Sequence, residues 1–403
     1  MSAVRAKDTA LVQRLLDEDR EPGMLDAAFG LAVRMHAGGL ASLLLQYGAD
    51  PDRCGPGELL SLREAVESGS PALVEALLDP RILGRCPASE FSQMRDLARH
   101  WHEVGAEAEL RRRTGSQEAV VRTRVEDDEY YSVDEFTLGR MTVRDGHGAI
   151  LTDLERLAGV RTAFEELMAR ALGHDEDHAM WGTATILLAN RRDQETWSAA
   201  AALRTHAAPS HRLFGAQVLR LTHLFDDSDE DAFARPALDI FTDWSAGEED
   251  LAVLIEVLVA LGEHADPRAD TALLAHAGHP DPRVRSAVAR GVGTRSESPA
   301  FRDEVREALL VLMTDVDPAV RLNACLSIGE GKDRDTVLAD ALAALLDDTD
   351  RQVRIAAVHG LALHRDERCV EAANRLGPPQ PDVPSEEHYL ASAWRYERCR
   401  DHC

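Results

Sequence analysis

Apolar residues recur at every fourth position after three similar five-residue segments in the C-terminal part of the chain. The segments begin with Asp, end with Val-Arg, and occupy Asp281–Arg285, Asp317–Arg321 and Asp350–Arg354. They start 36 and 33 residues apart. A spacing of four places residues such as Val284 and Val288 on one face of a helix. Because repeats of this length stack into arrays, the pattern predicts a helical-repeat array and not one closed core.

Each repeat is predicted to hold two helices. The Asp of each segment is expected to cap the second helix, because its carboxylate can accept hydrogen bonds from free amides of the first turn. Pro282 and Pro318 fit the first helical position, where a missing N–H costs nothing, and Arg351 takes that place in the third segment. Other apolar helices precede the second and third segments, marked by Val305, Leu309 and Leu312, then by Leu338, Leu342 and Leu345. Neither helix pair can bury its apolar face alone, so neighbouring pairs must stack.

These segments and the paired helices resemble the HEAT-repeat family, in its PBS-lyase-like form. The resemblance implies a curved α-solenoid in which the Asp and Arg of each segment form a ladder between repeats. Weaker copies lie upstream, at Leu251–Leu261, at 213–219 and at Met180–Ala189. We therefore expect about six units over 160–376, of which the first three are degenerate.

Residues 1–115 carry a second period. The pair Leu44-Leu45 recurs as Leu77-Leu78, and Ala32 recurs as Ala65, both 33 residues later. With the phrase Leu-Leu-Gln-Tyr-Gly-Ala-Asp at 44–50, this resembles ankyrin repeats. The segment 62–65 keeps only the Leu and the Ala of the Thr-Pro-Leu-His-x-Ala phrase of that family. The resemblance implies a recognition module of about three units with a helical cap over 90–113.

The connector, 116–159, fits neither repeat. Val121, Thr123 and Val125 alternate with charged residues, which predicts a β-hairpin or an ordered loop, with a partly mobile linker as the alternative. An acidic and aromatic run follows, made of Glu126, Asp127, Asp128, Glu129, Tyr130 and Tyr131. Because a long segment outside the repeats is often functional, we take this run as a candidate partner-binding site. Trp181 and His211, from the degenerate repeats, are the other two candidates.

The last segment, 377–403, begins with a Pro-rich stretch, 377–384, that is expected to form a stiff linker and to stop the solenoid. After it, an amphipathic helix is predicted from Tyr389, Leu390, Ala393, Trp394 and Tyr396. This helix either packs on the final repeat as a cap or docks into a groove of a partner. The expected fold is thus all-α, with ankyrin-like repeats, a connector, a HEAT-like solenoid and a C-terminal helix.

Acidic residues outnumber basic ones by 71 to 45, giving a net charge of −26. This excess argues against nucleic-acid binding, which needs clustered Lys and Arg. It favours a protein or peptide partner with basic patches, although an acidic surface can also serve solubility alone. The N-terminus lacks the apolar core of a signal peptide, and no uncharged apolar run reaches membrane length. With six cysteines and no CxxC pair, we expect a reduced, cytoplasmic protein that does not contact membranes.

His174 and His178 have the spacing of a helical metal pair. Asp175, however, stands where the zincin motif has Glu, and Asp177 is placed to cap a repeat helix. A calcium loop is also not expected at Asp227, Asp229 and Asp231, because Ala232 and Leu238 replace its Gly and its bidentate Glu. The sequence therefore predicts neither a zinc site nor a calcium site at these places.

Two further patterns are incomplete. Gly329–Asp333 resembles a phosphate loop but has Asp in place of the Ser or Thr that binds magnesium. Cys399, His402 and Cys403 could bind a soft metal but lack a fourth ligand. We expect no catalytic residue, no metal and no cofactor.

The leading functional hypothesis is a scaffold or adaptor that binds a protein or peptide through the concave surfaces of its repeats. The alternative is a lyase or modifying enzyme, since bilin lyases and alkylpurine DNA glycosylases have HEAT-like folds. Its active site would lie in the groove of the degenerate repeats, 160–262, where the candidates are His174, His178, Trp181, His206, His211 and His223. A pocket with a buried His and a carboxylate in hydrogen-bond reach would favour the enzyme, and a shallow surface the scaffold.

Overall fold

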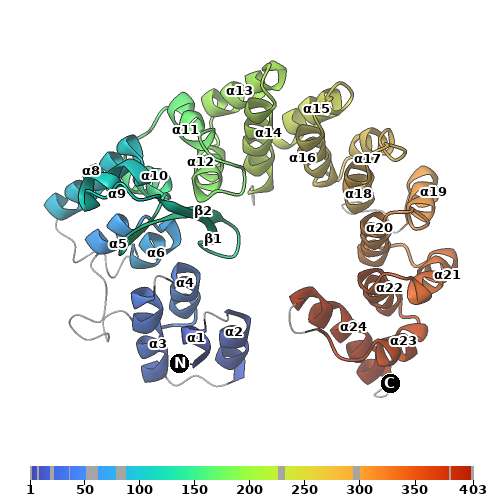
Figure 1. Cartoon of the computed structure of the whole chain (residues 1–403). Helices are drawn as coiled ribbons and strands as arrows, with labels where there is room; N and C mark the ends of the chain where they lie inside the picture. The colour runs from blue at the N-terminus through green and yellow to red at the C-terminus, as the bar shows by residue number, and fades with distance from the viewer. Residues whose placement is uncertain are drawn as a thin grey trace. The chain divides into compact units, whose positions relative to one another are not determined.

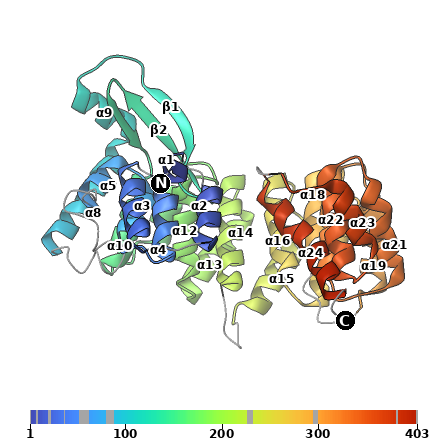
Figure 2. The same cartoon turned by 90° about the horizontal axis from the view of Figure 1, so that it is seen from below.

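The computed structural model describes residues 2–6, 9–18, 22–35, 37–50, 62–78, 88–225, 232–293, 300–380 and 383–400. The chain divides into two compact units, Met1–Arg191 (unit 1) and Arg192–Cys403 (unit 2). Helices dominate both units (Figures 1 and 2). Among these helices, none combines the length and the apolar character needed to cross a membrane. The four-part division expected from the sequence stays a prediction.

Unit 1 begins with eight described helices, of which α1 to α8 share one core and α9 belongs to a second. They are α1 (Ser2–Arg5), α2 (Thr9–Glu18), α3 (Pro22–Arg34), α4 (Gly38–Gln46), α5 (Leu62–Ser68), α6 (Pro71–Leu77), α8 (Ala88–Val104) and α9 (Ala106–Thr114). Helix α4 packs between α3 and α6, and α5 packs on α6 and α8. The residues of the 33-residue period, Ala32, Leu44, Ala65 and Leu77, are all buried in this core. The paired helices are thus present, and their assignment to ankyrin repeats stays a prediction.

The connector forms a three-stranded antiparallel sheet. Its strands are β1 (Val121–Glu126), β2 (Ser132–Leu138) and β3 (Met141–Arg144), in the order β1-β2-β3. The turn between β2 and β3 is tight, with Leu138 opposite Met141 and Gly139 at a φ of 63° that disfavours other residues. Phe136, Leu138 and Val143 form a second small core with Trp101 of α8 and Leu110 of α9. The sheet therefore rests on α8 and α9.

Unit 1 ends with three helices, α10 (His147–Leu157), α11 (Phe164–Ala171) and α12 (Ala179–Ala189). Helix α10 packs on α8 and α12, and α11 packs on α12. Because α10 starts directly after β3, it connects the sheet to these helices.

Unit 2 stacks its helices in two layers (Figure 1). The inner helices are α14 (Pro209–Leu224), α16 (Leu251–Gly262), α18 (Pro282–Gly291), α20 (Pro318–Glu330), α22 (Arg351–Leu363) and α24 (Pro384–Arg400). The outer helices are α13 (Gln194–Ala202), α15 (Ala234–Ser245), α17 (Pro267–Leu274), α19 (Asp303–Leu312), α21 (Thr336–Ala344) and α23 (Arg368–Leu376). Each inner helix packs on the next inner helix. This arrangement is the stacked array that the sequence predicts.

The predicted caps are confirmed. The carboxylates of Asp281, Asp317 and Asp350 accept from first-turn amides of α18, α20 and α22. Pro282 and Pro318 begin the first two of these helices. The same cap precedes α16, where Asp250 accepts from the amides of Ala252 and Val253.

The predicted ladder between repeats is wrong in one partner. Arg285 donates to Asp315, at 2.7 and 2.8 Å, and Arg321 donates to Asp348, at 2.8 Å for both bonds. Each of these aspartates lies two residues before the capping Asp and also accepts from the amide of that residue, at 2.8 Å. The capping carboxylate is already used by the helix amides, so a second carboxylate receives the arginine.

The same geometry occurs in the degenerate repeats. Arg212 donates to Glu248 at 2.9 and 2.7 Å, and Glu248 accepts from the amide of the capping residue Asp250. The next Arg–carboxylate pair of the ladder is missing because both of its residues are replaced. Leu254 of α16 takes the position of the Arg, and His279 takes the position of the carboxylate. The amide of Asp281 donates to the His279 ring instead, at 3.1 Å.

The C-terminal helix α24 packs against α22, which supports the cap interpretation. Leu390 and Ala393 are buried. Glu386 is also buried, and accepts from Arg351 at 3.1 Å and from the Gln352 side chain at 2.7 Å. The Pro-rich stretch thus does not stop the stack of inner helices. Arg351, which replaces the proline of the other two segments, helps to hold the last helix.

Candidate functional site

The candidate site is a cleft of about 580 Å³ in unit 1. It lies beside α8, α9 and the sheet, and the turn before α12 closes one side. Its polar lining includes Trp101, His102, Arg122, Asp145, His147 and His174. These residues come from segments that are far apart in the sequence, and the fold alone brings them together.

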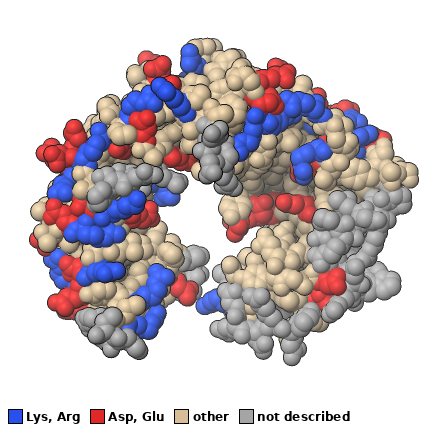
Figure 3. Space-filling view, turned by 180° about the vertical axis from the view of Figure 1, so that it is seen from behind, with Lys and Arg blue, Asp and Glu red and all other residues tan. Residues whose placement is uncertain are grey.

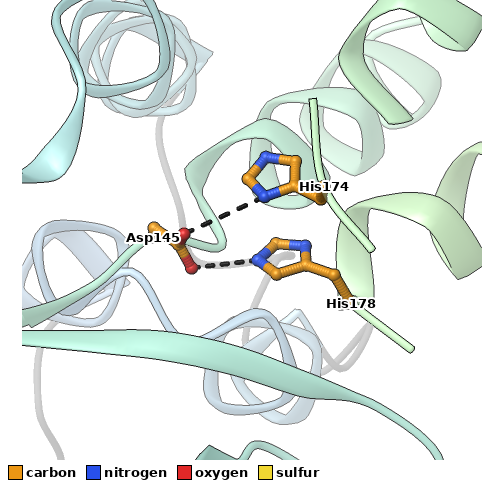
Figure 4. Close-up of side chains that lie close together, drawn as sticks. All are labelled: Asp145, His174 and His178. Carbon is orange, nitrogen blue, oxygen red and sulfur yellow. Dashed lines mark hydrogen bonds and ion pairs between the residues drawn. The ribbon is translucent and has the colours of Figure 1, made fainter. Parts of the chain in front are cut away.

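The Asp145 carboxylate faces the edges of two histidine rings (Figure 4). Its Oδ1 is 2.9 Å from His178 Nε2, and its Oδ2 is 3.9 Å from His174 Nδ1. The two imidazole rings stack, with centroids 3.8 Å apart and an interplanar angle of 14°. The structure thus provides a buried His and a carboxylate in hydrogen-bond reach, but Asp145 and most of the cleft lie outside the 160–262 range in which the enzyme alternative placed its active site.

The backbone fixes these three side chains. Asp145 follows β3 and extends its pairing with β2, because its amide donates to Asp134 O at 3.0 Å and its Oδ1 accepts from the Asp134 amide at 2.9 Å. The turn with both histidines is tied to β2 by a bond from the Ser132 amide to Asp177 O at 2.9 Å. The histidines are therefore not on a helix, as their spacing suggested, but in the turn between α11 and α12.

His178 caps α12, a role that the sequence assigned to Asp177. Its Nδ1 accepts from the Met180 amide at 3.0 Å, while Asp177 forms an ion pair with Arg124. Because Nδ1 is an acceptor, the proton of the neutral ring lies on Nε2 and is donated to Asp145. An imidazole can cap a helix as a carboxylate does, and here it links the cap to the cluster.

The electrostatic environment favours ionised Asp145 and neutral His174. Burial alone would raise the pKa of Asp145, but the hydrogen bonds from His178 and the Asp134 amide outweigh it, and the pKa is lowered. Burial lowers the pKa of His174 to about 4. Near neutral pH, Asp145 therefore presents an anionic oxygen ligand and His174 a neutral nitrogen ligand.

Two buried polar atoms in the cleft wall are unpaired. Within the described structure, Trp101 Nε1 and His147 Nε2 have no hydrogen-bond partner. The two rings stack at 4.8 Å, and the Arg113 guanidinium lies 4.6 Å from the Trp101 ring centroid. Burial lowers the pKa of His147 to about 3. A buried polar atom without a partner is costly, so these two atoms mark a place where water or a ligand group can bind.

The acidic and aromatic run divides into buried and exposed residues. Asp127 is buried and accepts from Ser70 at 2.6 Å, from the Ala72 amide at 2.7 Å and from Arg144 at 2.8 Å. It holds the loop after β1 onto α6. Glu126, at the end of β1, is exposed.

The rest of the run forms the turn between β1 and β2. Asp128 accepts from the amides of Tyr130 and Tyr131, both at 2.7 Å. The Tyr131 ring lies against α12, where a Cβ added to Gly182 would be 2.2 Å from its Cζ. Glu129 and Tyr130 are exposed, Tyr130 to 75%. The run thus presents Glu126, Glu129 and Tyr130 to solvent.

The other candidates do not gather at one place. Trp181 is buried. In unit 2, His211 stacks on His206 at 3.9 Å and His223 stacks on His264 at 4.2 Å. The histidines of 160–262 therefore form separate stacked pairs. Among the described residues, only the His174–His178 pair is joined by a carboxylate, that of Asp145, into a group of potential metal ligands.

The incomplete motifs have the following positions. Asp227 and Asp229 lie outside the described residues, as do Asp231, His402 and Cys403, while Cys399 is exposed on α24. Gly329 and Glu330 end α20, and the following turn leads to α21, so this segment is a turn between helices as expected. Asp333 in that turn accepts from the Phe301 amide at 3.1 Å and from Arg306 at 2.8 Å.

Sequence reasoning missed Asp145, Trp101 and His147. Asp145 stands at the end of the connector, and no period or motif links it to His178, 33 residues later. Trp101 lies within the predicted helical cap of the first repeats. The spacing of His174 and His178 was the one sequence signal for this cleft, and no motif pointed to its other residues.

Residues 305–376 match the family model of HEAT repeats, so this part of unit 2 is similar to HEAT repeats. No curated protein sequence matches the chain. Among solved structures, an X-ray structure of YibA from Escherichia coli, a structural genomics target, is similar with a TM-score of 0.42 and 17% identity. That match covers 59% of this chain and 93% of YibA.

Proposed function

We propose that the chain is a helical-repeat scaffold that binds a protein or peptide partner with basic patches. The observation that carries the proposal is the inner layer of unit 2, in which α14, α16, α18, α20, α22 and α24 pack consecutively (Figure 1). A stack of this kind presents one extended surface, which is how repeat proteins bind partners.

Helix α20 illustrates how the inner layer of unit 2 packs. On α20, Leu322 and Asn323 are half-buried, whereas Val320 and Ala324 are fully buried. Asn323 donates to Ser286 of α18 at 2.7 Å, so neighbouring inner helices are joined by small polar side chains.

The charge of unit 2 suits a basic partner. Unit 2 has 38 acidic and 23 basic residues. Its ladder arginines Arg212, Arg285 and Arg321 are already paired with carboxylates. On the face drawn in Figure 3, basic side chains alternate with acidic ones, unlike the clustered cations that nucleic-acid binding requires. The remaining negative charge would speed association with a basic partner and make it sensitive to salt.

Affinity capture with the full chain tests the proposal. One dominant basic protein should be retained at low salt, released at high salt and identified by mass spectrometry. Asn323→Arg places a long cation on the inner surface, and we expect it to weaken capture about tenfold. Val311→Arg is the matched control, because Val311 is 69% exposed on the outer helix α19. A wild-type chain that retains no stoichiometric protein, or equal effects of both variants, would contradict the proposal.

We extend the proposal to unit 1, whose N-terminal helix pairs resemble ankyrin repeats. Glu126, Glu129 and Tyr130 are its candidate contact residues, since the structure leaves them exposed. Neutralising both glutamates, as Glu126→Gln with Glu129→Gln, tests whether unit 1 contacts the same partner as unit 2. An unchanged association rate would restrict the proposed surface to unit 2.

A second candidate is an enzyme with its active site in the unit 1 cleft. The Asp145–His178 hydrogen bond favours it. Among the described residues that line the cleft, however, there is no Ser, Thr, Cys, Lys or Tyr to act as a nucleophile. Both ring nitrogens of His178 are also engaged, with Asp145 and with the Met180 amide. We therefore place the scaffold first, and expect Asp145→Asn to leave partner capture unchanged.

A further inference from the structure

We propose that Asp145, His174 and His178 bind a divalent transition-metal ion, with Zn²⁺ as the first candidate and one coordination position open to the cleft. This site is separate from the proposed partner surface of unit 2, so either proposal can fail alone. Among the described residues, this is the group of His, Cys, Asp and Glu side chains whose potential ligand atoms all lie within 4.8 Å of one another.

The distances fit a metal after small side-chain rotations. Zn²⁺ binds oxygen and nitrogen at about 2.0–2.2 Å, so tetrahedral ligands lie roughly 3.4 Å apart. Asp145 Oδ1 is 2.9 Å from His178 Nε2 and its Oδ2 is 3.9 Å from His174 Nδ1, and with one ligand atom per residue the group lies within 4.8 Å. The two carboxylate oxygens already point to the two rings (Figure 4).

The donor set is also that of an open zinc site. Two imidazoles and one carboxylate hold catalytic zinc in several protein classes, with water or substrate in the fourth position. Asp145 and His174 line the cleft, so the fourth position would face it. The second shell is present as well, because the Asp134 amide orients Asp145.

Metal binding would require the other tautomer of His178. In the metal-free chain the single proton of the neutral ring lies on Nε2, between the ring and Asp145. The metal would bind Nε2 and this proton would move to Nδ1 without being released, so His178 could no longer accept from the Met180 amide. This competition predicts weaker binding than at closed structural zinc sites.

The chain offers a matched control for the histidine pair. His206 and His211 stack at 3.9 Å and 12°, nearly as His174 and His178 do at 3.8 Å and 14°. No described carboxylate completes a metal-ligand group at that pair. If stacked histidines alone bound the metal, His211→Ala would weaken binding, whereas our proposal requires the Asp145 cluster.

The experiment is titration of the full metal-free chain with Zn²⁺ by calorimetry, and with Co²⁺ by visible absorption. We expect one ion per wild-type chain. His174→Ala and Asp145→Asn should weaken binding about 100-fold or more, since loss of an outer-shell group alone often costs 10–100-fold. The amide introduced by Asp145→Asn keeps an acceptor for the Asp134 amide, and His174 lies in a turn, so circular dichroism should show both variants folded. His211→Ala should bind as the wild type does.

A double variant tests whether the C-terminal cysteines bind the metal instead. Cys399→Ser with Cys403→Ser removes the potential soft-metal ligands at that end of the chain, and we expect unchanged binding and no cobalt–thiolate absorption in the wild type. Three results would overturn the proposal: no binding by the wild type at millimolar metal, loss of binding only in the cysteine variant, or binding by His174→Ala and Asp145→Asn equal to that of the wild type.

Discussion

Arginine–carboxylate pairs stabilise both units, but the two units arrange them differently. In unit 2, Arg285 and Arg321 reach carboxylates 30 and 27 residues later, in the next repeat, and stay 13% and 12% exposed. In unit 1, Arg144 at the end of β3 pairs with Asp127 in the loop after β1. The Arg144 side chain is 10% exposed and that of Asp127 1%, against 11% and 7% for Asp315 and Asp348 in unit 2. The pairs of unit 2 repeat the same contact from one repeat to the next, whereas the Arg144–Asp127 pair of unit 1 is not repeated.

The difference has an energetic consequence. A partly hydrated pair that joins neighbouring repeats contributes modestly, and its partners can be solvated by water if it breaks. A buried pair gains little over an apolar contact, but removing one member leaves an unpaired buried charge. Unit 2 therefore distributes its stability over many similar contacts, whereas unit 1 depends on a few.

The largest predicted effect is that of Arg144→Met in unit 1. The change leaves the Asp127 carboxylate buried with only Ser70 and the Ala72 amide as donors. We expect the free energy of unfolding of unit 1 to fall by about 3–5 kcal/mol. Urea denaturation and hydrogen exchange of the β2 and β3 amides would measure this loss.

Arg122→Met is the control for this variant. Arg122 is 67% exposed, and its partner Asp134 keeps Arg124. We expect a loss within about 1 kcal/mol. Similar losses in Arg144→Met and Arg122→Met would show that the buried pair is not special and would remove the distinction between the units.

A smaller effect is predicted for Arg285→Met in unit 2. Arg285 makes two bonds to Asp315 and one to His279 O at 2.8 Å, so its loss should cost about 1–2 kcal/mol in urea denaturation of unit 2. Arg283→Met, two residues earlier on α18, is matched to it. Arg283 is 66% exposed and pairs with Asp281 of its own repeat. Equal midpoints for the two variants would contradict a stabilising ladder.

The sequence predicted contacts that follow local rules and missed those that depend on the folded chain. The caps at Asp317 and Asp350 were predicted because a cap involves only the next few residues. Asp315 and Asp348 were missed as ladder partners, although both stand in Asp-x-Asp phrases that could have indicated two different roles.

The cleft of unit 1 could not be found in this way. Asp145 meets His178 only because β3 pairs with β2 and the Ser132 amide holds the turn at Asp177. Neither contact has a period or a motif. The role of Arg351 was hidden for a similar reason, since its partner Glu386 lies beyond the Pro-rich stretch. Contacts that recur in each repeat leave a period in the sequence, so they can be predicted from it. Contacts that occur at one place leave no such pattern.

The smallest predicted effect is a pH dependence at the end of the array. His359 of α22 is buried against α24, with its Nδ1 2.5 Å from Ser392 Oγ, and burial lowers its pKa to about 4, aided by His388 and Arg395. Because this pKa is below the usual value of about 6.5, the neutral ring stabilises docking of α24 fully above pH 6.5. That stabilisation should decline as the pH falls from about 6.5 to about 4. Hydrogen exchange of α24 amides measures it.

The ion pair of Glu386 provides a control for this pH dependence of hydrogen exchange in α24. The pKa of Glu386 is lowered, because the bonds from Arg351 and the Gln380 amide outweigh the effect of burial, so its contribution is lost only below the usual carboxyl range near pH 4.5. Faster hydrogen exchange of α24 amides between about pH 6.5 and about pH 4.5 would therefore be caused by protonation of His359 and not of Glu386. His359→Gln should abolish the slope in this range while keeping a polar contact with Ser392. A slope that persists in His359→Gln would show that α24 is held by contacts independent of this ring, as the repeated pairs of unit 2 are.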